Sequence, residues 1–316
     1  MTDITMIDAA AARLAGHARR TPLLSSPFLD DLAGRRVLVK AECLQHTGSF
    51  KFRGAWNAIT ALEPAGVIAF SSGNHAQGVA LAARMKGISA VIIMPSDAPA
   101  IKIANTRELG AEVVLYDRAT EDRDALGDRL AAERGLTLIK PFDMAEVIAG
   151  QGTCGLEIAE QAAVEGVTEA DVLVCCGGGG LTSGVALALE ARAPGLRVRP
   201  AEPEGFDDVA RSLATGTVQT NPRLSGSICD AIVTPRPGAL TWPIIQRLCG
   251  PGAVVSEEQA LRAMALAHDR LKIVLEPGGA VALAAALFLP GQGDAVIALA
   301  TGGNVDRAMM ARALAL

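Results

Sequence analysis

Short apolar runs rich in β-branched residues alternate along the chain with longer segments whose apolar positions recur at helical spacing. This alternation is typical of repeated strand-helix units and predicts an α/β fold with mostly parallel sheets. The predicted strands are Arg36–Lys40, Val67–Phe70, Ala90–Met94, Glu112–Leu115, Asp171–Cys175, Arg197–Ala201 and Ala295–Ala300.

No linker rich in Pro, Gly or Ser divides the chain, and no internal repeat is found. The strand-helix units between Val67 and Asp143 nevertheless form a compact group, with chemically distinctive segments before and after it. We therefore expect a small inserted domain at residues 66–145 and a large domain made of residues 1–65 plus 146–316.

The composition excludes several classes of protein. Half of the 316 residues are hydrophobic and 20% are charged, which is typical of a globular protein with a large core. The net charge is −5, and aromatic residues make up only 3% of the chain, so we expect no nucleic-acid partner. The six cysteines lack the paired spacing of a metal site and are expected to be buried free thiols.

Residues 172–189 carry no charge, but four glycines interrupt them, so a strand, a loop and a helix are expected there rather than a membrane span. The first eight residues lack the basic start and apolar run of a secretory signal. We therefore expect a protein of the cytoplasm that does not enter a membrane.

Lys51 follows a Gly-Ser turn and begins an apolar helix within the segment Thr47–Ala55. An amine between apolar neighbours has a lowered pKa and can form a Schiff base with a carbonyl cofactor. The alternative is an ordinary lysine at a helix start whose amine reaches solvent.

The segment Ser71–Gly78 follows a predicted strand and opens a helix. The first amides of a helix have no intrahelical partners, so hydroxyl and amide side chains there suit a substrate carboxylate. The alternative is a helix cap by Ser72 or Asn74.

Four consecutive glycines, Gly177, Gly178, Gly179 and Gly180, join a predicted strand to a helix. Their backbone N–H groups can surround a phosphate, whereas a purely structural turn needs fewer glycines. Thr182 and Ser183 stand where a dinucleotide site has a third glycine, and Val185 stands where a P-loop has a lysine, so a phosphate without a nucleotide is favoured.

Thr301 ends the last predicted strand in the segment Ala300–Asp306, where its neutral hydroxyl could meet a ring nitrogen or could cap the final helix. Glu276 begins a similar turn, Glu276–Ala280, and is interpreted as structural unless the site requires more of it.

In this order, the lysine turn, the Ser-Ser-Gly-Asn-His loop, the glycine loop and the Thr-Gly-Gly-Asn turn resemble the pyridoxal-phosphate enzymes of fold type II over nearly the whole chain. The likeness is to the group of threonine and serine dehydratases, hydroxyaspartate dehydratases and serine racemases. It implies two lobes, each with a mostly parallel twisted sheet flanked by helices.

The resemblance also implies roles for individual residues. Lys51 would carry pyridoxal 5'-phosphate, Phe50 would lie near its ring, Asn74 would bond its phenolic oxygen, and Gly177 to Gly180 would hold its phosphate. Thr301 would meet the pyridine nitrogen as a neutral hydroxyl, which favours elimination over transamination. The substrate would be bound by Ser71, Ser72, Gly73, Asn74 and His75.

Two further sites rest on the same resemblance. Glu202 and Asp208 match a site for Mg²⁺ or Ca²⁺ in some members, the alternative being solvated acids in a loop. Arg123 falls near an arginine of racemase-like relatives that would bind a second substrate carboxylate, the alternative being a surface helix start.

These observations together predict a pyridoxal-phosphate-dependent ammonia-lyase that converts a β-hydroxy amino acid, first of all L-threonine or L-serine, to a 2-oxo acid and ammonia. Lys51 would remove the Cα proton, and Ser72 would face the opposite side and permit some racemisation. The alternatives are a 3-hydroxyaspartate dehydratase, a serine or aspartate racemase with side elimination, and a nucleotide-binding module without catalysis. A homodimer is expected.

Overall fold

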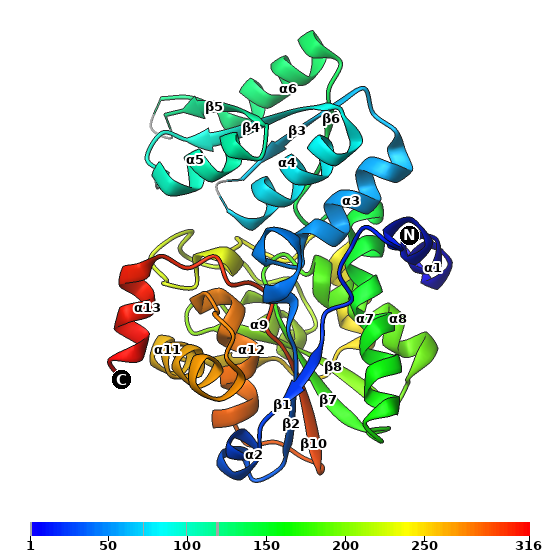
Figure 1. Cartoon of the computed structure of the whole chain (residues 1–316), viewed down its shortest axis with the longest axis vertical. Helices are drawn as coiled ribbons and strands as arrows, with labels where there is room; N and C mark the ends of the chain where they lie inside the picture. Colours follow the sequence, from blue (N-terminus) through cyan, green and yellow to red (C-terminus); the bar gives the residue numbers. More distant parts are fainter. Residues whose placement is uncertain (1, 72, 99, 118–119) are drawn as a thin grey trace.

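The computed structural model describes residues 2–71, 73–98, 100–117 and 120–316 of the chain. Two sheets lie one above the other, with helices on both faces of each (Figure 1). In the six-stranded sheet the order is β1 (Leu23–Ser25), β2 (Arg36–Lys40), β10 (Ala295–Leu299), β7 (Ala170–Cys175), β8 (Leu196–Pro203) and β9 (Ala253–Val255). In the four-stranded sheet it is β5 (Glu112–Tyr116), β4 (Ser89–Pro95), β3 (Gly66–Phe70) and β6 (Thr137–Leu138).

The prediction of an α/β fold with mostly parallel sheets is confirmed. All seven predicted strands are present, with ends within two residues of those expected. Every strand pair is parallel except β1 with β2. The three strands that the pattern missed, β1, β6 and β9, have at most three residues each, too few for a period to be visible. The domain boundaries at 65/66 and 145/146 stay a prediction.

The helices form layers against the sheets. In the six-stranded sheet, α7 (Ala145–Val164) and α8 (Gly180–Arg192) cover one face, and α11 (Glu257–Leu266) and α12 (Pro277–Phe288) cover the other (Figure 1). In the four-stranded sheet, α4 (Asn74–Lys86) and α5 (Ala100–Glu108) lie opposite α6 (Arg123–Arg134). The remaining α-helices are α1 (Ile4–Leu14), α2 (Pro27–Ala33), α3 (Lys51–Leu62), α9 (Asp208–Thr215), α10 (Thr241–Leu248) and α13 (Arg307–Leu314).

Small residues let these layers approach closely. A Cβ atom on Gly184 of α8 would lie 2.4 Å from the carbonyl oxygen of Ile148 in α7, so the two helices pack nearly backbone to backbone. The residues of α12 from Pro277 to Leu287 are all buried, which an alanine-rich helix tolerates on every side. The core is therefore built largely from Ala, Val, Leu and Ile.

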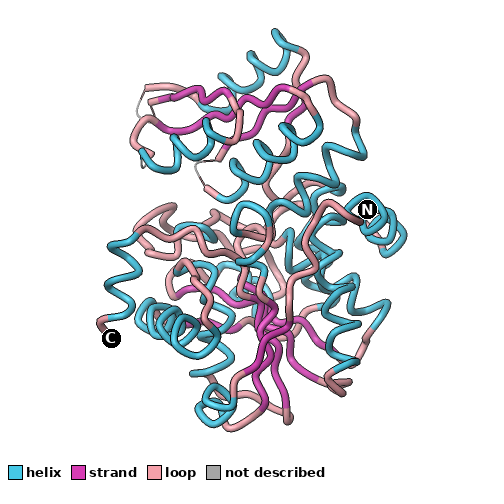
Figure 2. The backbone as a smooth tube through the Cα atoms, viewed as in Figure 1, coloured by secondary structure: helices cyan, strands magenta, loops and turns pink. Residues whose placement is uncertain are grey.

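The loops that carry the sequence motifs follow the carboxyl ends of strands, and these ends determine where the loops lie. Loops and turns gather between the two sheets, where β3, β7 and β10 end (Figure 2). In open α/β sheets, ligands bind beyond the carboxyl ends of the strands. The fold thus brings the lysine turn, the loop after β3 and the glycine loop to one region.

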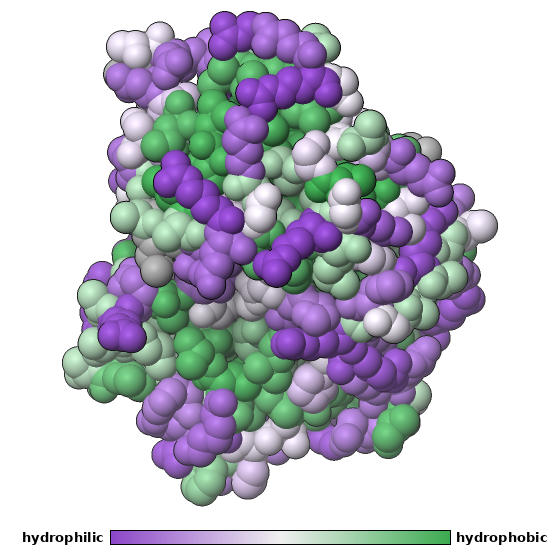
Figure 3. Space-filling view, turned by 45° about the horizontal axis from the view of Figure 1, so that its top comes forward, coloured by the Kyte–Doolittle hydropathy of each residue, from purple (hydrophilic) through white to green (hydrophobic). Residues whose placement is uncertain are grey.

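The surface and the cysteines complete this description. On the face presented in Figure 3, hydrophilic and hydrophobic side chains are interspersed. Among the helices of the described chain, none is both long and apolar enough to cross a membrane. All six cysteines are free thiols as predicted; five are buried and Cys249 is half-buried.

Candidate active site

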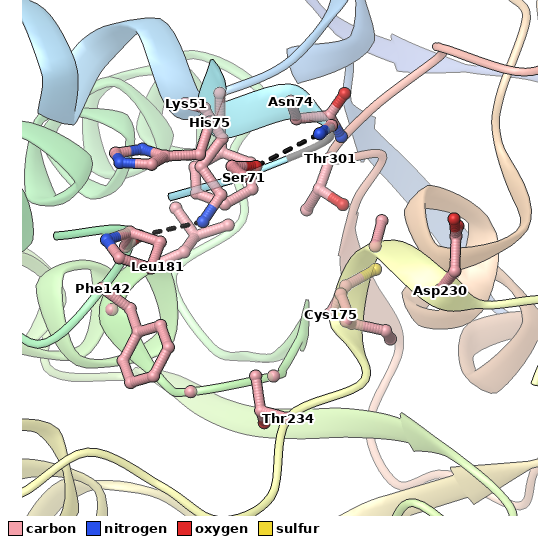
Figure 4. Close-up of a pocket in the computed structure, with 18 of the residues that line it drawn as sticks. Lys51, Ser71, Asn74, His75, Phe142, Cys175, Leu181, Asp230, Thr234 and Thr301 are labelled. Carbon is pink, nitrogen blue, oxygen red and sulfur yellow. Dashed lines mark hydrogen bonds between the residues drawn. The ribbon is translucent and has the colours of Figure 1, made fainter. Parts of the chain in front are cut away.

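A cavity of about 230 Å³ lies between the two sheets, and all four sequence motifs contribute to its wall. Lys51 and Phe142 lie on one side of it, and Thr301, Cys175 and Asp230 lie on the other (Figure 4). Residues predicted from the sequence that line it are Phe50, Lys51, Ser71, Gly73, Asn74, His75, Gly177, Gly178, Gly179, Gly180 and Thr301.

Lys51 is the first residue of α3 and presents its amine to this cavity (Figure 4). Its Nζ donates a hydrogen bond to the carbonyl oxygen of Pro141 at 2.9 Å and lies 5.1 Å from the centre of the Phe50 ring. Burial lowers the pKa of Lys51 to about 8, although the nearby Glu276 carboxyl acts in the opposite direction. The amine is still mostly protonated at neutral pH, but its neutral, nucleophilic fraction is far larger than that of an ordinary lysine.

The turn before Lys51 is held by the turn that carries Thr301, about 250 residues later in the chain. The Phe50 N–H donates to the Thr301 carbonyl at 3.2 Å, and the Gly303 N–H donates to the Gly48 carbonyl at 2.9 Å. Ser49 and Gly302 pair between these bonds as an antiparallel bridge. The amine and the Thr301 hydroxyl therefore belong to one backbone-bonded unit.

Behind the cavity, Arg53 anchors the first turn of α3. Its guanidinium binds both oxygens of Glu42, at 2.8 Å each, and contacts Glu157. Arg53 and Glu42 are both buried. Burial would raise the pKa of Glu42, but the charges of Arg53 and Lys40 and the hydrogen bonds from Arg53 and Thr21 together outweigh it, so this pKa lies below its usual value. The ion pair fixes the helix end from which Lys51 projects.

The loop after β3 supplies polar groups to the cavity. Gly73 precedes the first residue of α4 without a side-chain cap, so the alternative of a cap by Asn74 is wrong. The Gly73 N–H instead donates to the Ser71 hydroxyl at 3.1 Å. Ser72, predicted to act in catalysis and substrate binding, lies outside the described residues.

His75 is buried in the first turn of α4, with Nε2 2.8 Å from the carbonyl oxygen of Ile139. Because a carbonyl only accepts, Nε2 carries the proton of the neutral ring. Burial, helped by the Lys51 charge, lowers the pKa of His75 to about 3. The imidazole is therefore neutral at ordinary pH and is suited to positioning rather than to acid catalysis.

The orientation of the Asn74 amide follows from a chain of hydrogen bonds. Nδ2 of Asn304 donates to the Thr47 carbonyl at 2.8 Å and to Oδ1 of Asn74 at 2.6 Å. Nδ2 of Asn74 must then face the other way, where it donates to Glu276 at 2.5 Å. An amide nitrogen has two protons, so the second N–H of Asn74 is left for a ligand in the cavity.

The sequence left Glu276 as structural unless the site required it, and in the fold it belongs to the cavity wall. It directly precedes α12, is 6% exposed and lines the cavity, where its carboxyl receives the Asn74 bond. Burial raises its pKa to about 7, against the Asn74 hydrogen bond, which lowers it. The sequence does not reveal this role for two reasons. Glu276–Ala280 looks like an ordinary helix start, and Glu276 stands 202 residues from Asn74 in the chain.

The glycine loop joins β7 to α8 and borders the cavity as predicted. The N–H groups of Gly177, Gly178, Gly179 and Gly180 find no hydrogen-bond acceptor among the described residues. Together with the amino end of α8, these free donors form a site suited to an anion. A phosphate is the anion for which such loops are built most often.

Packing, however, also requires these glycines. Gly179 has φ +90°, and a Cβ on Gly178 would lie 2.3 Å from the Phe142 ring. A Cβ on Gly177 would approach the Ile232 carbonyl to 2.9 Å, and one on Gly180 would approach the Phe142 backbone to 3.0 Å. Packing therefore favours glycine at all four positions, contrary to the expectation that a purely structural turn needs fewer, and the unbonded N–H groups are the observation that indicates an anion site.

Thr301 lies beyond β10, is 4% exposed and faces the cavity across from Lys51 (Figure 4). It does not cap the last helix, because Asp306 performs that function for α13 by accepting the Met309 N–H. Cys175 lies beside it, and burial raises the pKa of this thiol to about 11. The Thr301 and Cys175 side chains opposite Lys51 are therefore uncharged.

Arg123 and the predicted metal ligands lie outside this wall. Arg123 is exposed at the start of α6, with its guanidinium 5.1 Å from the centre of the Phe70 ring, and Phe70 lines the cavity. Glu202 and Asp208 are buried rather than solvated. Burial raises the pKa of both carboxyl groups, that of Asp208 to about 6.

The chain is similar to known proteins over nearly its whole length. A family model described as pyridoxal-phosphate dependent enzyme matches residues 14–302. An L-threo-3-hydroxyaspartate ammonia-lyase from Pseudomonas sp is 46% identical, with 94% of this chain and 93% of that protein covered. The solved structure of a maize serine racemase has a TM-score of 0.92 at 38% identity, covering 99% of this chain and 97% of that one. The solved structure of a T.th. threonine deaminase has a TM-score of 0.91 at 44% identity, covering 96% and 99%.

Proposed function

Because the chain belongs to the family of pyridoxal-phosphate-dependent enzymes, we propose that it is an ammonia-lyase that converts a β-hydroxy amino acid to a 2-oxo acid and ammonia. The observation that carries this proposal is the Lys51 amine of lowered pKa, which shares a cavity with the unbonded N–H groups of the glycine loop. Because this family consists of enzymes, the alternative of a nucleotide-binding module without catalysis is not supported.

The residues of the cavity fit the cofactor. Lys51 would hold it covalently through Nζ, and the free N–H groups of Gly177 to Gly180 would bind its phosphate. The second N–H of Asn74 would donate to its phenolic oxygen, and the Thr301 hydroxyl would meet its ring nitrogen. When bound, pyridoxal phosphate supplies an electron sink that makes the Cα proton of an amino acid acidic.

Residues of the chain would then transfer the proton and bind the substrate. Lys51 would take the Cα proton at Nζ, which the Pro141 carbonyl orients and which burial keeps partly neutral. The loop from Ser71 to His75, at the amino end of α4, would hold the α-carboxylate of the substrate. The neutral His75 would support that loop through its bond to Ile139 without exchanging protons.

The uncharged hydroxyl of Thr301 supports elimination as the reaction. A hydroxyl beside the ring nitrogen leaves that nitrogen largely unprotonated, and this makes the electron sink weaker than a carboxylate partner would. The α-amino group is then released as ammonia after loss of the β-hydroxyl, and transamination is disfavoured. L-threonine and L-serine are the substrates expected from the sequence; a threonine deaminase and serine racemases among the relatives are consistent with both.

A divalent cation bound by Asp208 and Glu202 is part of the proposal. Oδ2 of Asp208 is buried and has no hydrogen-bond partner among the described residues, as expected of an oxygen that binds a cation. The two Glu202 oxygens accept the N–H groups of Val209 and Ala210, and each retains a lone pair. In the described chain no group of three or more metal-ligating side chains is found, so backbone carbonyls and water would have to complete Mg²⁺ or Ca²⁺ coordination.

The test is spectroscopic and chemical. Purified protein should carry a visible absorption band that borohydride removes, and a panel of β-hydroxy amino acids should identify at least one that releases ammonia and a 2-oxo acid in equal amounts. Lys51→Ala should lack both. Protein that holds the cofactor yet releases no ammonia from any member of the panel would contradict the proposal. The expected homodimer is measured by light scattering in the same preparation.

A further inference from the structure

The cavity wall carries charge from two side chains that the proposed reaction does not use. Lys102 of α5 and Asp230 of the short helix η3 (Asp230–Ile232) both line the cavity. Nζ of Lys102 lies 3.2 Å from Oδ2 of Asp230. The pair bridges two parts of the fold, because α5 packs beside the four-stranded sheet and η3 contacts α12 on the other sheet. It therefore closes one side of the cavity.

Lys102 is the cation that a substrate can use. Among the described residues that line the cavity, the other charged side chains are Lys51, Asp230 and Glu276. Lys51 is committed to the cofactor in the proposed function, and the two carboxyl groups would repel a second substrate carboxylate. If the cavity binds an amino acid with two carboxylates, Lys102 is therefore the cation available to the second carboxylate.

The contact between Lys102 and Asp230 is weak enough to be exchanged. The Lys102 side chain is 26% exposed and that of Asp230 is 65% exposed, so water screens the pair. Exposed ion pairs contribute little to stability. An ammonium group has three donors, and Asp230 uses one of them. Another carboxylate can therefore join or replace Asp230 at small cost.

We infer that Lys102 binds the distal carboxylate of a dicarboxylic β-hydroxy amino acid of the 3-hydroxyaspartate class, and that Asp230 holds Lys102 in place until such a substrate arrives. This inference rests on the proposed function and specifies its substrate class. L-serine and L-threonine have a single carboxylate, which the loop from Ser71 to His75 would bind. Their binding therefore does not require Lys102.

Arg123 provides a matched comparison, because it is the cation that the sequence suggested for the same carboxylate. It is exposed and lies against the face of Phe70, whereas Phe70 itself lines the cavity. Arg123 contacts a lining residue but is not itself among the described residues that line the cavity. The geometry favours Lys102 over Arg123 as the group that reads the distal carboxylate.

The experiment compares Lys102→Gln with Arg123→Gln in the holoenzyme. For Lys102→Gln, kcat/KM for L-threo-3-hydroxyaspartate should fall at least ~30-fold relative to kcat/KM for L-serine, because a charge-assisted hydrogen bond is lost for one substrate only. Lys102→Arg should restore part of this ratio, and Arg123→Gln should change it less than ~3-fold. In Asp230→Asn the ratio should rise, since a competing carboxylate is removed.

Binding of succinate, an unreactive dicarboxylate with the same two-carbon spacing between its carboxylates as 3-hydroxyaspartate, gives a readout that is independent of turnover. Calorimetry should find its Kd raised ~10-fold or more in Lys102→Gln and little changed in Arg123→Gln. A selective loss in Arg123→Gln, or equal loss for both substrates in Lys102→Gln, would overturn the inference. Wild-type turnover of L-serine without turnover of 3-hydroxyaspartate would overturn the inference while leaving the proposed function intact. Failure to turn over any substrate would contradict the proposed function, and succinate binding would still decide the role of Lys102.

Discussion

Asn74 and Glu276 stand 202 residues apart in the chain and meet across the cavity wall, where Nδ2 of Asn74 donates a hydrogen bond to Oε1 of Glu276 at 2.5 Å. The bond joins the start of α4 to the start of α12. It leaves no room for a side chain at Gly302, because a Cβ there would lie 2.0 Å from the same Glu276 oxygen. The carboxyl therefore sets the position of the amide that would contact the cofactor.

Replacement of Glu276 by Gln should change how stability depends on pH. Its pKa is raised to about 7 in the folded protein, so the folded state favours the protonated carboxyl. The resulting stabilisation is fully present below the ordinary pKa and is lost as pH rises through about 7. Relative to Glu276→Gln, the wild-type free energy of unfolding should therefore decline with pH between about 4.5 and 7, by at most about 1.4 kcal/mol per pH unit.

Urea denaturation of the cofactor-free proteins across this pH range measures the difference. Parallel pH profiles for the wild type and Glu276→Gln would contradict the assignment. In the loaded enzyme, the same substitution should remove the pH dependence of the visible band in this window, because Asn74 then keeps one partner at every pH.

Lys51→Ala should abolish the visible band and nearly all turnover, since no other amine projects from this turn. Lys51→Arg should fail as well, because a guanidinium does not deprotonate to attack a carbonyl. Absorption spectra and ammonia release measure both effects. Lys140→Ala, which removes an exposed lysine next to Pro141, is the control and should retain the band. If the visible band survived in Lys51→Ala, the cofactor would be bound covalently by another amine.

The unbonded N–H groups of the glycine loop should make cofactor binding depend strongly on the phosphate. We expect pyridoxal phosphate to bind at least ~100-fold more tightly than pyridoxal, because charge-assisted bonds to several backbone donors are lost with the phosphate. Titration of Lys51→Ala with both compounds separates this effect from the covalent bond. Equal affinities for pyridoxal phosphate and pyridoxal would show that this loop does not bind the phosphate. Substitution of Gly178 or Gly179 is a poorer test, since packing and φ already exclude side chains there.

Glu42→Gln should destabilise the fold by about 3–5 kcal/mol, because it leaves the buried Arg53 guanidinium without its main counter-charge. Urea denaturation measures the loss. Arg20→Ala is the control: its ion pair with Glu160 is exposed on both sides, and its removal should change stability by less than about 1 kcal/mol. Similar effects of the two substitutions would show that burial adds nothing to the Arg53 pair.

Mg²⁺ or Ca²⁺ should raise the Tm of the wild-type protein if Asp208 and Glu202 bind a cation, since a ligand that binds only the folded state stabilises it. Asp208→Asn should remove the shift, because it replaces the partnerless carboxylate oxygen that the site would use. Differential scanning calorimetry with and without each salt provides the measurement. An equal Tm shift in the variant would indicate a general salt effect.

The sequence by itself determined most of the fold. Strands such as β2 and β7 are buried runs of five or six residues whose pattern is visible locally, and their bounds were predicted closely. It also identified the loops of the site, because the lysine turn and the glycine loop each carry their chemistry within a few consecutive residues. Local patterns suffice wherever the deciding interactions lie within one element.

Tertiary structure alone decided which distant side chains share the cavity. Glu276 and Lys102 stand in segments that look ordinary in the sequence, and they reach the wall only because α12 and α5 pack at the ends of different sheets. The pKa of Glu276 depends on burial by groups from several elements, and the Asn74 orientation depends on Asn304 and Thr47. Such properties arise from contacts between segments that lie about 200 residues or more apart, and no periodicity along the chain encodes them.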